Sequence, residues 1–196
     1  MGVTGTSGPN RVVVVRPRTD DLLRDARLRL LSSDLDYLFL ELCCSEDSTR
    51  SRLVPHGCLA VRVTLGTDLT LPTTKKALHS MTRHAIANDI EIHAWVSIAC
   101  TAGCRLRYLN DKLGITTGDP DFTERLIVAA CTICGHISRV GQSFSWEWPE
   151  TNLLWGDSRV QILAEKNRAV TCLVSTAAVG MSFKHPQTGE EDAAYL

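Results

Sequence analysis

Residues 37–48 read Tyr-Leu-Phe-Leu-Glu-Leu-Cys-Cys-Ser-Glu-Asp-Ser, and this stretch decides the fold class. An apolar run rich in strand-forming residues carries one acid, Glu41, and gives way to small and polar residues. A helix-compatible stretch, Thr49 to Val54, follows. This order is typical of the first strand and turn of a nucleotide- or cofactor-binding α/β domain, whose ligand lies beyond the carboxyl end of the strand. The turn contains no glycine, the residue that usually allows such a tight bend.

The remainder of the chain alternates between strand and helix patterns. Apolar runs that predict strands lie at 37–43, 58–65, 90–100, 142–148 and 170–179. Apolar residues at helical spacing predict helices at 19–32, 73–87, 122–140 and 158–166. This alternation predicts an α/β fold with a three-layer, Rossmann-like sheet, mostly parallel, and helices on both faces.

The active edge of such a sheet can be predicted from connectivity. Right-handed crossovers bring the carboxyl ends of parallel strands to one edge. The turns after Cys43, Leu65, Cys100 and Trp148 should therefore share that edge, which is where a ligand is expected. We expect residues 1–18 to form a flexible N-terminal arm, 19–183 the Rossmann-like domain, and 184–196 a flexible tail.

Composition narrows the classes of partner. The chain has 196 residues, 44% of them hydrophobic, with a net charge of -1 and a pI near 6.6, so no global field favours nucleic acid or anionic membrane. No segment approaches the roughly 20 apolar residues of a membrane span, and a secretory signal is absent. The eight cysteines are therefore interpreted as reduced thiols of an intracellular protein, cytoplasmic or nuclear.

In this setting the chain resembles the S-adenosylmethionine-dependent methyltransferase superfamily, most closely the catalytic half of DNA cytosine-5 methyltransferases. Residues 41–48 match the family's first strand end and cofactor turn, and 66–70 echo its adenine-contacting element. Residues 98–103 echo the catalytic cysteine loop, and Glu147-Trp148-Pro149 echoes the glutamate strand end. Leu173 to Gly180 resembles the strand that closes the catalytic core, so the resemblance spans roughly 37–181 in order.

The resemblance implies roles for particular residues. It implies S-adenosyl-L-methionine as cofactor, with the contacts Glu41, Cys43, Cys44, Ser45 and Asp68. It also implies Cys100 as the nucleophile that adds to cytosine C6, and Glu147 as the acid that holds the base. A buried structural cysteine and an acid at a strand end are the alternative interpretations of these two residues.

Three departures separate the chain from the family pattern. The cofactor turn lacks glycine, Ala99 replaces the proline before the cysteine, and no Gln-x-Arg-x-Arg element follows Gly180. The target-recognition domain is also missing, and the charge does not favour duplex DNA. Two functions therefore stay open: a methyltransferase acting on cytosine, or an inactive Rossmann-like module, such as a segment of a mobile-element polyprotein, with a binding role.

Two further interpretations concern the cysteines. A thiol hydrolase using Cys100 is disfavoured because no Gly-x-Cys-x-Gly elbow is present. Cys131, Cys134 and His136 lie within one predicted apolar helix, where core packing is a better interpretation than zinc binding. We expect no metal.

Overall fold

A computed structural model describes ten parts of the chain. These are residues 13–15, 26, 30–31, 35–45, 48, 57–103, 112, 119–173, 182–184 and 191–193, with residue 48 and residue 112 standing alone. All structural statements below concern these residues.

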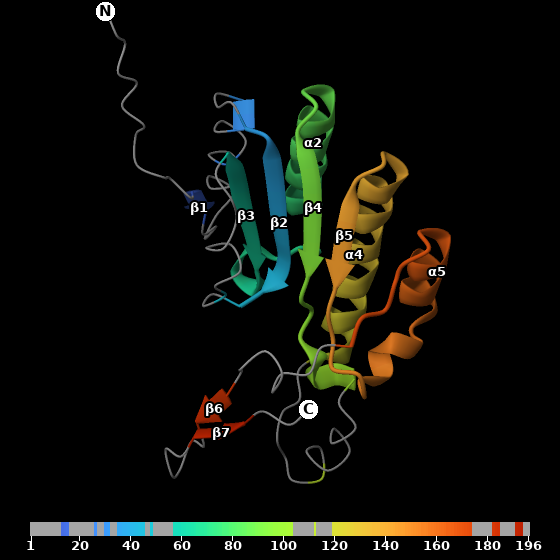
Figure 1. Cartoon of the computed structure of the whole chain (residues 1–196). Coiled ribbons are helices and arrows are strands. Elements are labelled where there is room, and N and C mark those ends of the chain that lie inside the picture. Colours follow the sequence, from blue (N-terminus) through green and yellow to red (C-terminus); the bar gives the residue numbers. More distant parts are fainter. Residues whose placement is uncertain are drawn as a thin grey trace, which may run out of the picture.

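The centre of the molecule is a parallel sheet (Figure 1). Its strands are β1 (Val13–Val15), β2 (Tyr37–Cys44), β3 (Cys58–Thr64), β4 (Glu91–Val96) and β5 (Ser143–Trp146), in the spatial order β1-β3-β2-β4-β5. Every pairing in this sheet is parallel, so the carboxyl ends of the strands lie at one edge, at the bottom of Figure 1. Strand β2 is central, because β3 pairs with one of its sides and β4 with the other.

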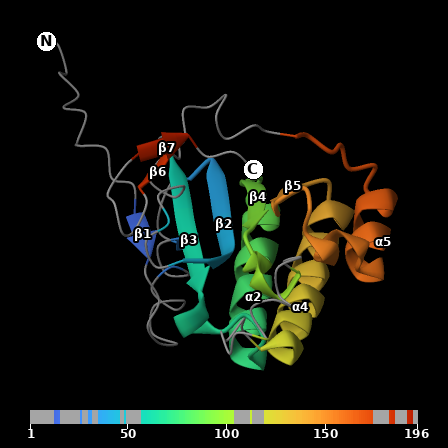
Figure 2. The same cartoon turned by 90° about the horizontal axis from the view of Figure 1, so that it is seen from below.

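The described helices lie along one face of the sheet (Figure 2). They are α2 (Pro72–Ala87), α4 (Pro120–Arg139) and α5 (Ser158–Lys166), with short 3-10 turns η2 (Leu65–Thr67), η3 (Cys100–Gly103) and η4 (Leu153–Gly156) at the same edge as the strand ends. Aspartate side chains begin two of the helices: Asp119 accepts from the backbone N–H of Asp121, and Asp157 from that of Arg159. These caps satisfy N–H groups that have no partner inside a helix.

Both faces of β2 are buried, which explains its almost unbroken apolar sequence. On the helix face, Leu38, Leu40 and Leu42 are fully buried in the main core with residues of α2 and α4. On the opposite face, Phe39 lies in a smaller cluster with Ala60 and the half-buried Trp95. The central strand therefore contributes to two separate apolar layers.

The predicted fold class is confirmed: the protein is α/β with a parallel, Rossmann-like sheet flanked by helices. The predicted helix 158–166 agrees with α5 at both ends, and the other described helices and central strands agree within a few residues. The predicted helix at 49–54 lies outside the described residues.

Three segments differ from expectation. The predicted strand over 170–179 is wrong at its start, because residues 170–173 have no regular structure and Val170 is 91% exposed; 174–179 lie outside the described residues. Val13–Val15, expected within a flexible arm, pairs with β3 as the outer strand β1. Near the expected tail, β6 (Ser182–Lys184) and β7 (Glu191–Ala193) form a separate antiparallel pair.

The length and hydropathy of the helices bear on whether any could span a membrane. Within the described residues, none is both long enough and apolar enough to cross a bilayer.

Candidate functional site

The strand order places a topological switch point between β2 and β4. The chain passes from β2 to β3 on one side, and then through α2 to β4 on the other side of β2. In open α/β sheets, ligands bind outside the carboxyl ends of the strands at such a point. The residues after Cys44 and Val96 therefore mark the expected site.

Cys43 has an unusual backbone conformation at this edge. Its φ is 60°, in the left-handed region that favours glycine, and the register with β3 shifts between Leu42 and Cys44. Cys43 lies inside β2, just before the glycine-free turn, so a cysteine at the end of the strand adopts a conformation that usually favours glycine. Non-glycine residues with this backbone conformation occur more often at ligand sites than elsewhere. The conformation is unfavourable, so contacts from the surrounding structure must maintain it.

Asp68 lies close to Cys43, just after the neighbouring strand β3. Its carboxylate contributes, after burial and Cys44, to raising the pKa of Cys43 to about 12. Asp68 also has a positive φ, 45°, and its Oδ1 accepts hydrogen bonds from the backbone N–H and the hydroxyl of Thr70 at 2.9 and 2.6 Å. Both bonds use the same oxygen, which leaves Oδ2 as a further acceptor beside the β2 turn.

Glu41 is fully buried and bound from within the protein. It lies directly opposite Arg62 in the pairing of β2 with β3, and the Arg62 Nε is 3.6 Å from the Glu41 Oε2. The hydroxyl of Ser48 donates to Glu41 Oε1. The Glu41 carboxylate therefore faces Arg62 and Ser48, and its role as a direct cofactor contact stays a prediction.

Cys44 and Ser45 form the start of the turn. The Cys44 thiol is buried within reach of the Glu41 carbonyl, at 3.6 Å, and its pKa is raised to about 11, first by burial and then by the charge of Glu41. Ser45 is exposed, and its carbonyl oxygen accepts from Arg62 Nη2 at 2.8 Å and from the backbone N–H of Ser48 at 3.2 Å. At neutral pH both buried thiols of this turn are neutral.

Cys100 begins the short turn η3 after β4. Its side chain is half-buried against the helix-side core, and its carbonyl accepts from Asn152 Nδ2 at 2.9 Å. Asn152 is itself buried, and its Oδ1 accepts from the backbone N–H of Leu154. The turn that contains Cys100 is therefore hydrogen-bonded to the segment that follows β5.

Glu147 follows β5 at the same edge, but on the other face of the sheet. Its Oε1 accepts from the Ser97 hydroxyl at 3.1 Å, and Ser97 accepts from Trp95 Nε1 at 3.0 Å. Trp95 belongs to the cluster opposite the helices, whereas Cys100 packs with the helix-side core. The two predicted catalytic residues thus share the edge while facing opposite layers.

Trp148 is part of the core. It is 9% exposed, and its Nε1 donates to the Ile98 carbonyl at 2.8 Å. Its ring contacts those of Trp146 and Trp155 edge-on, with centroids 5.2 and 5.1 Å apart. Trp148 therefore joins the segments after β4 and β5, a packing role rather than stacking on a ligand.

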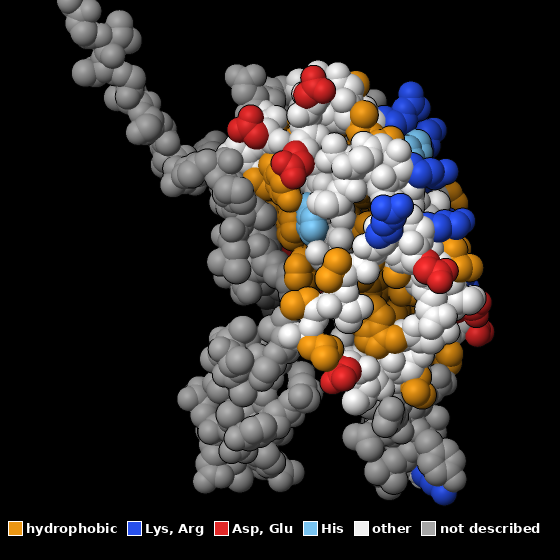
Figure 3. Space-filling view, turned by 45° about the vertical axis from the view of Figure 1, so that its right-hand side comes forward, with side chains coloured by type: hydrophobic (Ala, Val, Ile, Leu, Met, Phe, Trp, Pro, Cys, Tyr) orange, Lys and Arg blue, Asp and Glu red, His pale blue; other side chains and the backbone are white. Residues whose placement is uncertain are grey.

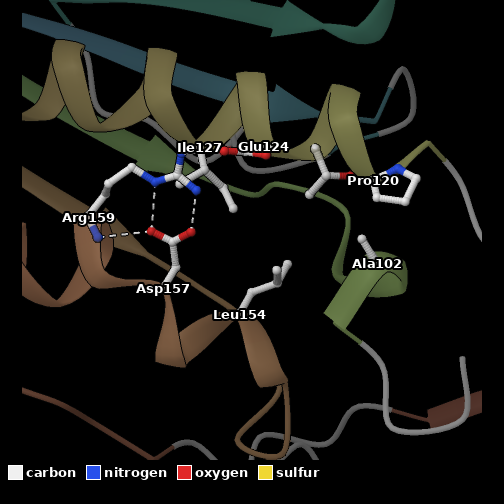
Figure 4. A pocket seen from close by; sticks show the side chains of 8 residues that line it. Ala102, Pro120, Glu124, Ile127, Leu154, Asp157 and Arg159 are labelled. Atoms are coloured by element: carbon white, nitrogen blue, oxygen red, sulfur yellow. Dashed lines mark hydrogen bonds and ion pairs between the residues drawn. The ribbon is translucent and has the colours of Figure 1, made fainter.

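A pocket of about 210 Å³ lies beside the cysteine turn (Figure 4). Its walls come from η3, the start of α4, η4 and the start of α5, and its lining comprises Ala102, Pro120, Thr123, Glu124, Ile127, Leu154, Asp157 and Arg159. Arg159 joins the two acids: Nη1 is 3.0 Å from Glu124 Oε1, and Nη2 is 2.5 Å from Asp157 Oδ2. Figure 4 shows this charged group at one end of the pocket and Leu154, Ala102 and Pro120 at the other.

Most of the basic side chains visible in Figure 3 lie away from this edge, although one lies at the lower end of the view and Arg159 lines the pocket. In Figure 3, Lys and Arg gather in the upper right part of the described surface, whereas the carboxyl edge is below. Arg139 and Lys166 stand in the last turns of α4 and α5, where cations complement the helix dipole. These positions are explained by helix stability and do not point to phosphate binding at the site.

The described residues also bear on metal binding. No group of three or more His, Cys, Asp or Glu side chains within the described residues is placed to hold a metal ion. Cys134 is fully buried in the main core, and burial raises its pKa above the usual range. His136 stacks on His79 of α2, with ring centroids 4.1 Å apart.

Sequence reasoning missed Arg62 and the charged residues of the pocket. Glu41 and Arg62 are each the only charge in an otherwise apolar strand, and that coincidence was the available signal for a buried ion pair. Glu124, Asp157 and Arg159 carried no comparable signal, because charged residues at and near the starts of amphipathic helices are common on their polar faces.

Comparison with known proteins gives no assignment. No protein-family model, curated protein or solved structure matches the chain. The proposed function therefore depends on the geometry of the carboxyl edge.

The first prediction concerns the close approach of η3 and Asn152. A Cβ on Gly103 would overlap the Asn152 carboxamide and the Leu154 side chain, whereas one on Gly156 would meet nothing. We expect Gly103→Ala to lower the free energy of unfolding by about 1–3 kcal/mol. Gly156→Ala should change it by less than about 0.5 kcal/mol. Urea denaturation measures both, and equal losses would contradict the packing described.

The second prediction concerns the thiols. Because burial raises the pKa of Cys43 to about 12 and that of Cys44 to about 11, both should stay protonated and resist iodoacetamide at pH 8. The exposed Cys172 should be alkylated at that pH. Raising the pH of the folded protein toward 11 should label Cys44 before Cys43, as read by peptide mass spectrometry. Rapid labelling of Cys43 at pH 8 would contradict its burial.

Proposed function

We propose that the chain is a Rossmann-like, methyltransferase-type domain that binds S-adenosyl-L-methionine at the carboxyl edge, beside the tips of β2 and β3. The observation that carries the proposal is that Cys43 and Asp68 lie near each other at the carboxyl edge of the sheet. Cys43 lies at the carboxyl end of β2 and Asp68 follows β3, both have positive φ, and the Asp68 carboxylate contributes to raising the pKa of Cys43. In Rossmann folds a tight turn at the first strand and an acid after the next strand hold the phosphate or sugar part of the ligand.

The residues at this edge fit an adenosine-type group. Asp68 Oδ2 would accept from ribose hydroxyls, since Oδ1 is used by Thr70. Ser45, exposed at the tip of β2, can offer its hydroxyl to the amino-acid part of the cofactor. S-adenosylmethionine supplies an activated methyl group when bound.

In this proposal Cys100 and Glu147 act on the methyl acceptor. Cys100, as a thiolate, would add to C6 of a cytosine ring, which makes C5 nucleophilic. Glu147 would accept from the exocyclic amine. The pocket beside η3 is the candidate place for the acceptor, because Ala102 of its wall belongs to the same turn as Cys100. Glu124 and Asp157 there can accept from amines, and Arg159 can donate to ring acceptors.

The third prediction tests cofactor binding. Asp68→Asn keeps the side-chain oxygen that bonds Thr70 but replaces the second oxygen by an amide donor. Isothermal calorimetry with S-adenosylhomocysteine should show saturable binding to the wild type and about tenfold weaker binding to Asp68→Asn, a loss of about 1.4 kcal/mol.

The matched control is Asp89→Asn. Asp89 also has a positive φ, 55°, but it follows α2 and precedes β4, at the opposite end of the sheet. We expect wild-type affinity for this variant. Absence of binding to the wild type at millimolar ligand would refute the proposal, and equal affinity of all three proteins would refute the role of Asp68.

A second function is favoured by a specific observation. Glu41 is bound by Arg62 and Ser48, and Cys100 and Glu147 face opposite layers of the sheet. These features favour an inactive Rossmann-like module with a binding or scaffolding role, such as a segment of a mobile-element polyprotein. In that case the edge binds a ligand or partner without transferring a methyl group.

The fourth prediction separates the two functions. If the domain is an active cytosine methyltransferase, incorporation of labelled methyl groups into single- or double-stranded nucleic acid should occur and should fall at least a hundredfold in Cys100→Ser. Cys172→Ser, at an exposed thiol distant from the edge in sequence, should retain wild-type incorporation. No incorporation by the wild type, together with preserved cofactor binding, would instead support the inactive module.

A further inference from the structure

Arg62 is the largest fully buried side chain among the described residues, and no known ligand explains it. It is 1% exposed, within a strand whose other residues are apolar or small, apart from Thr64. Burying a guanidinium away from water is unfavourable unless other groups bind it. Its partners include the Glu41 carboxylate and the Ser45 carbonyl oxygen.

We propose that Arg62 is a positioning residue, which holds the turn after β2 in the conformation that accepts the ligand, with Glu41 as its charge partner. This inference rests on the proposed cofactor site, because it assigns the group that shapes that site.

The contacts of Arg62 span the strained part of the turn. Its Nε lies 3.6 Å from Glu41, before Cys43, and its Nη2 donates at 2.8 Å to Ser45, after Cys43. One rigid guanidinium thus bridges the two ends of the register shift at which Cys43 adopts a φ of 60°. Arginine suits this task, since its planar group offers donors in a fixed fork.

Ser48 closes the same network. Its hydroxyl donates to the free side of the Glu41 carboxylate, and its backbone N–H donates to the Ser45 carbonyl that Arg62 also binds. The buried pair is therefore connected to the turn at two residues, Ser45 and Ser48. A glycine would reach the left-handed conformation without such support; a cysteine requires neighbouring contacts to keep it there.

A purely stabilising role is a weaker explanation. Buried ion pairs can often be replaced by apolar residues of similar size without loss of stability, because the desolvation of both charges is avoided. The hydrogen bond to Ser45 has no apolar substitute. Stability and turn geometry can therefore be separated experimentally.

The decisive variant is the double substitution Glu41→Leu/Arg62→Met. It removes both charges together and should fold cooperatively, with a midpoint of urea unfolding close to that of the wild type. If Arg62 positions the turn, amide hydrogen exchange at 45–48 should accelerate at least tenfold, and S-adenosylhomocysteine should bind at least tenfold more weakly. Wild-type exchange and wild-type affinity in this folded variant would overturn the inference.

Arg62→Lys provides a second variant in case the double substitution fails to fold. Lysine keeps the charge opposite Glu41 but, as a compact ammonium, cannot reproduce the fork that also reaches Ser45. We expect faster exchange at 45–48 and weaker binding, with stability largely retained. Rescue of both properties by lysine would show that charge alone suffices and would overturn the positioning role.

Arg139→Met is the matched control. Arg139 also donates to a backbone carbonyl, that of Gly135 at 2.9 Å, but on the exposed end of α4. It should leave exchange at 45–48 and ligand affinity unchanged. In the wild type, the Ser48 amide should be protected from exchange, whatever the behaviour of the variants; exchange at the rate of an unstructured peptide would overturn the inference.

The exchange measurement needs no ligand, which separates the two proposals. If the wild type does not bind S-adenosylhomocysteine but the variants loosen 45–48, the cofactor proposal fails and the positioning role of Arg62 stands. If the wild type binds and the variants change neither exchange nor affinity, the cofactor proposal stands and the role of Arg62 fails.

Discussion

Burial of β2 on both faces is the constraint on which the rest of this structure depends. Leu38, Leu40 and Leu42 pack in the main core between the sheet and the helices. Phe39 packs in the smaller hydrophobic cluster on the other face of the sheet. A charged residue on this strand can be tolerated only with a partner in a neighbouring strand. Arg62, directly opposite Glu41 on β3, is that partner, so the same pairing that completes the core also reaches the turn at the candidate site.

The carboxyl edge combines features of both functions that stay open. Cys43 and Asp68 form a turn and an acid at neighbouring strand tips, as a nucleotide-type ligand requires. Cys100 and Glu147 are held by Asn152 and Ser97 toward different layers of the sheet. The cofactor half of the methyltransferase proposal therefore has stronger geometric support than the catalytic half, and binding should be tested before turnover.

The elements that could be predicted from sequence are those whose buried residues recur at regular spacing within one short segment of the chain. Helix α5 agreed at both ends because its apolar stripe lies between two caps. The Asp157 side chain accepts from the backbone N–H of Arg159 at the start, and the backbone N–H of Asn167 donates to Leu163 and Glu165 carbonyls at the end. The strand expected over 170–179 failed at Val170 and Leu173, which are largely exposed. Strand propensity alone does not create a strand without a neighbour to pair with, and no local pattern reports whether that neighbour exists.

The sequence by itself determined the α/β class, the central buried strand, the shared edge of the strand ends and the absence of glycine from the turn after that strand, because these follow from periodicity and side-chain chemistry along the chain. Only the tertiary structure decided that Glu41 faces Arg62, that Cys43 takes the left-handed conformation, and that Cys100 and Glu147 point to opposite layers. The physical reason is that strand order, register and side-chain direction depend on pairing between segments far apart in the chain, which no local pattern specifies.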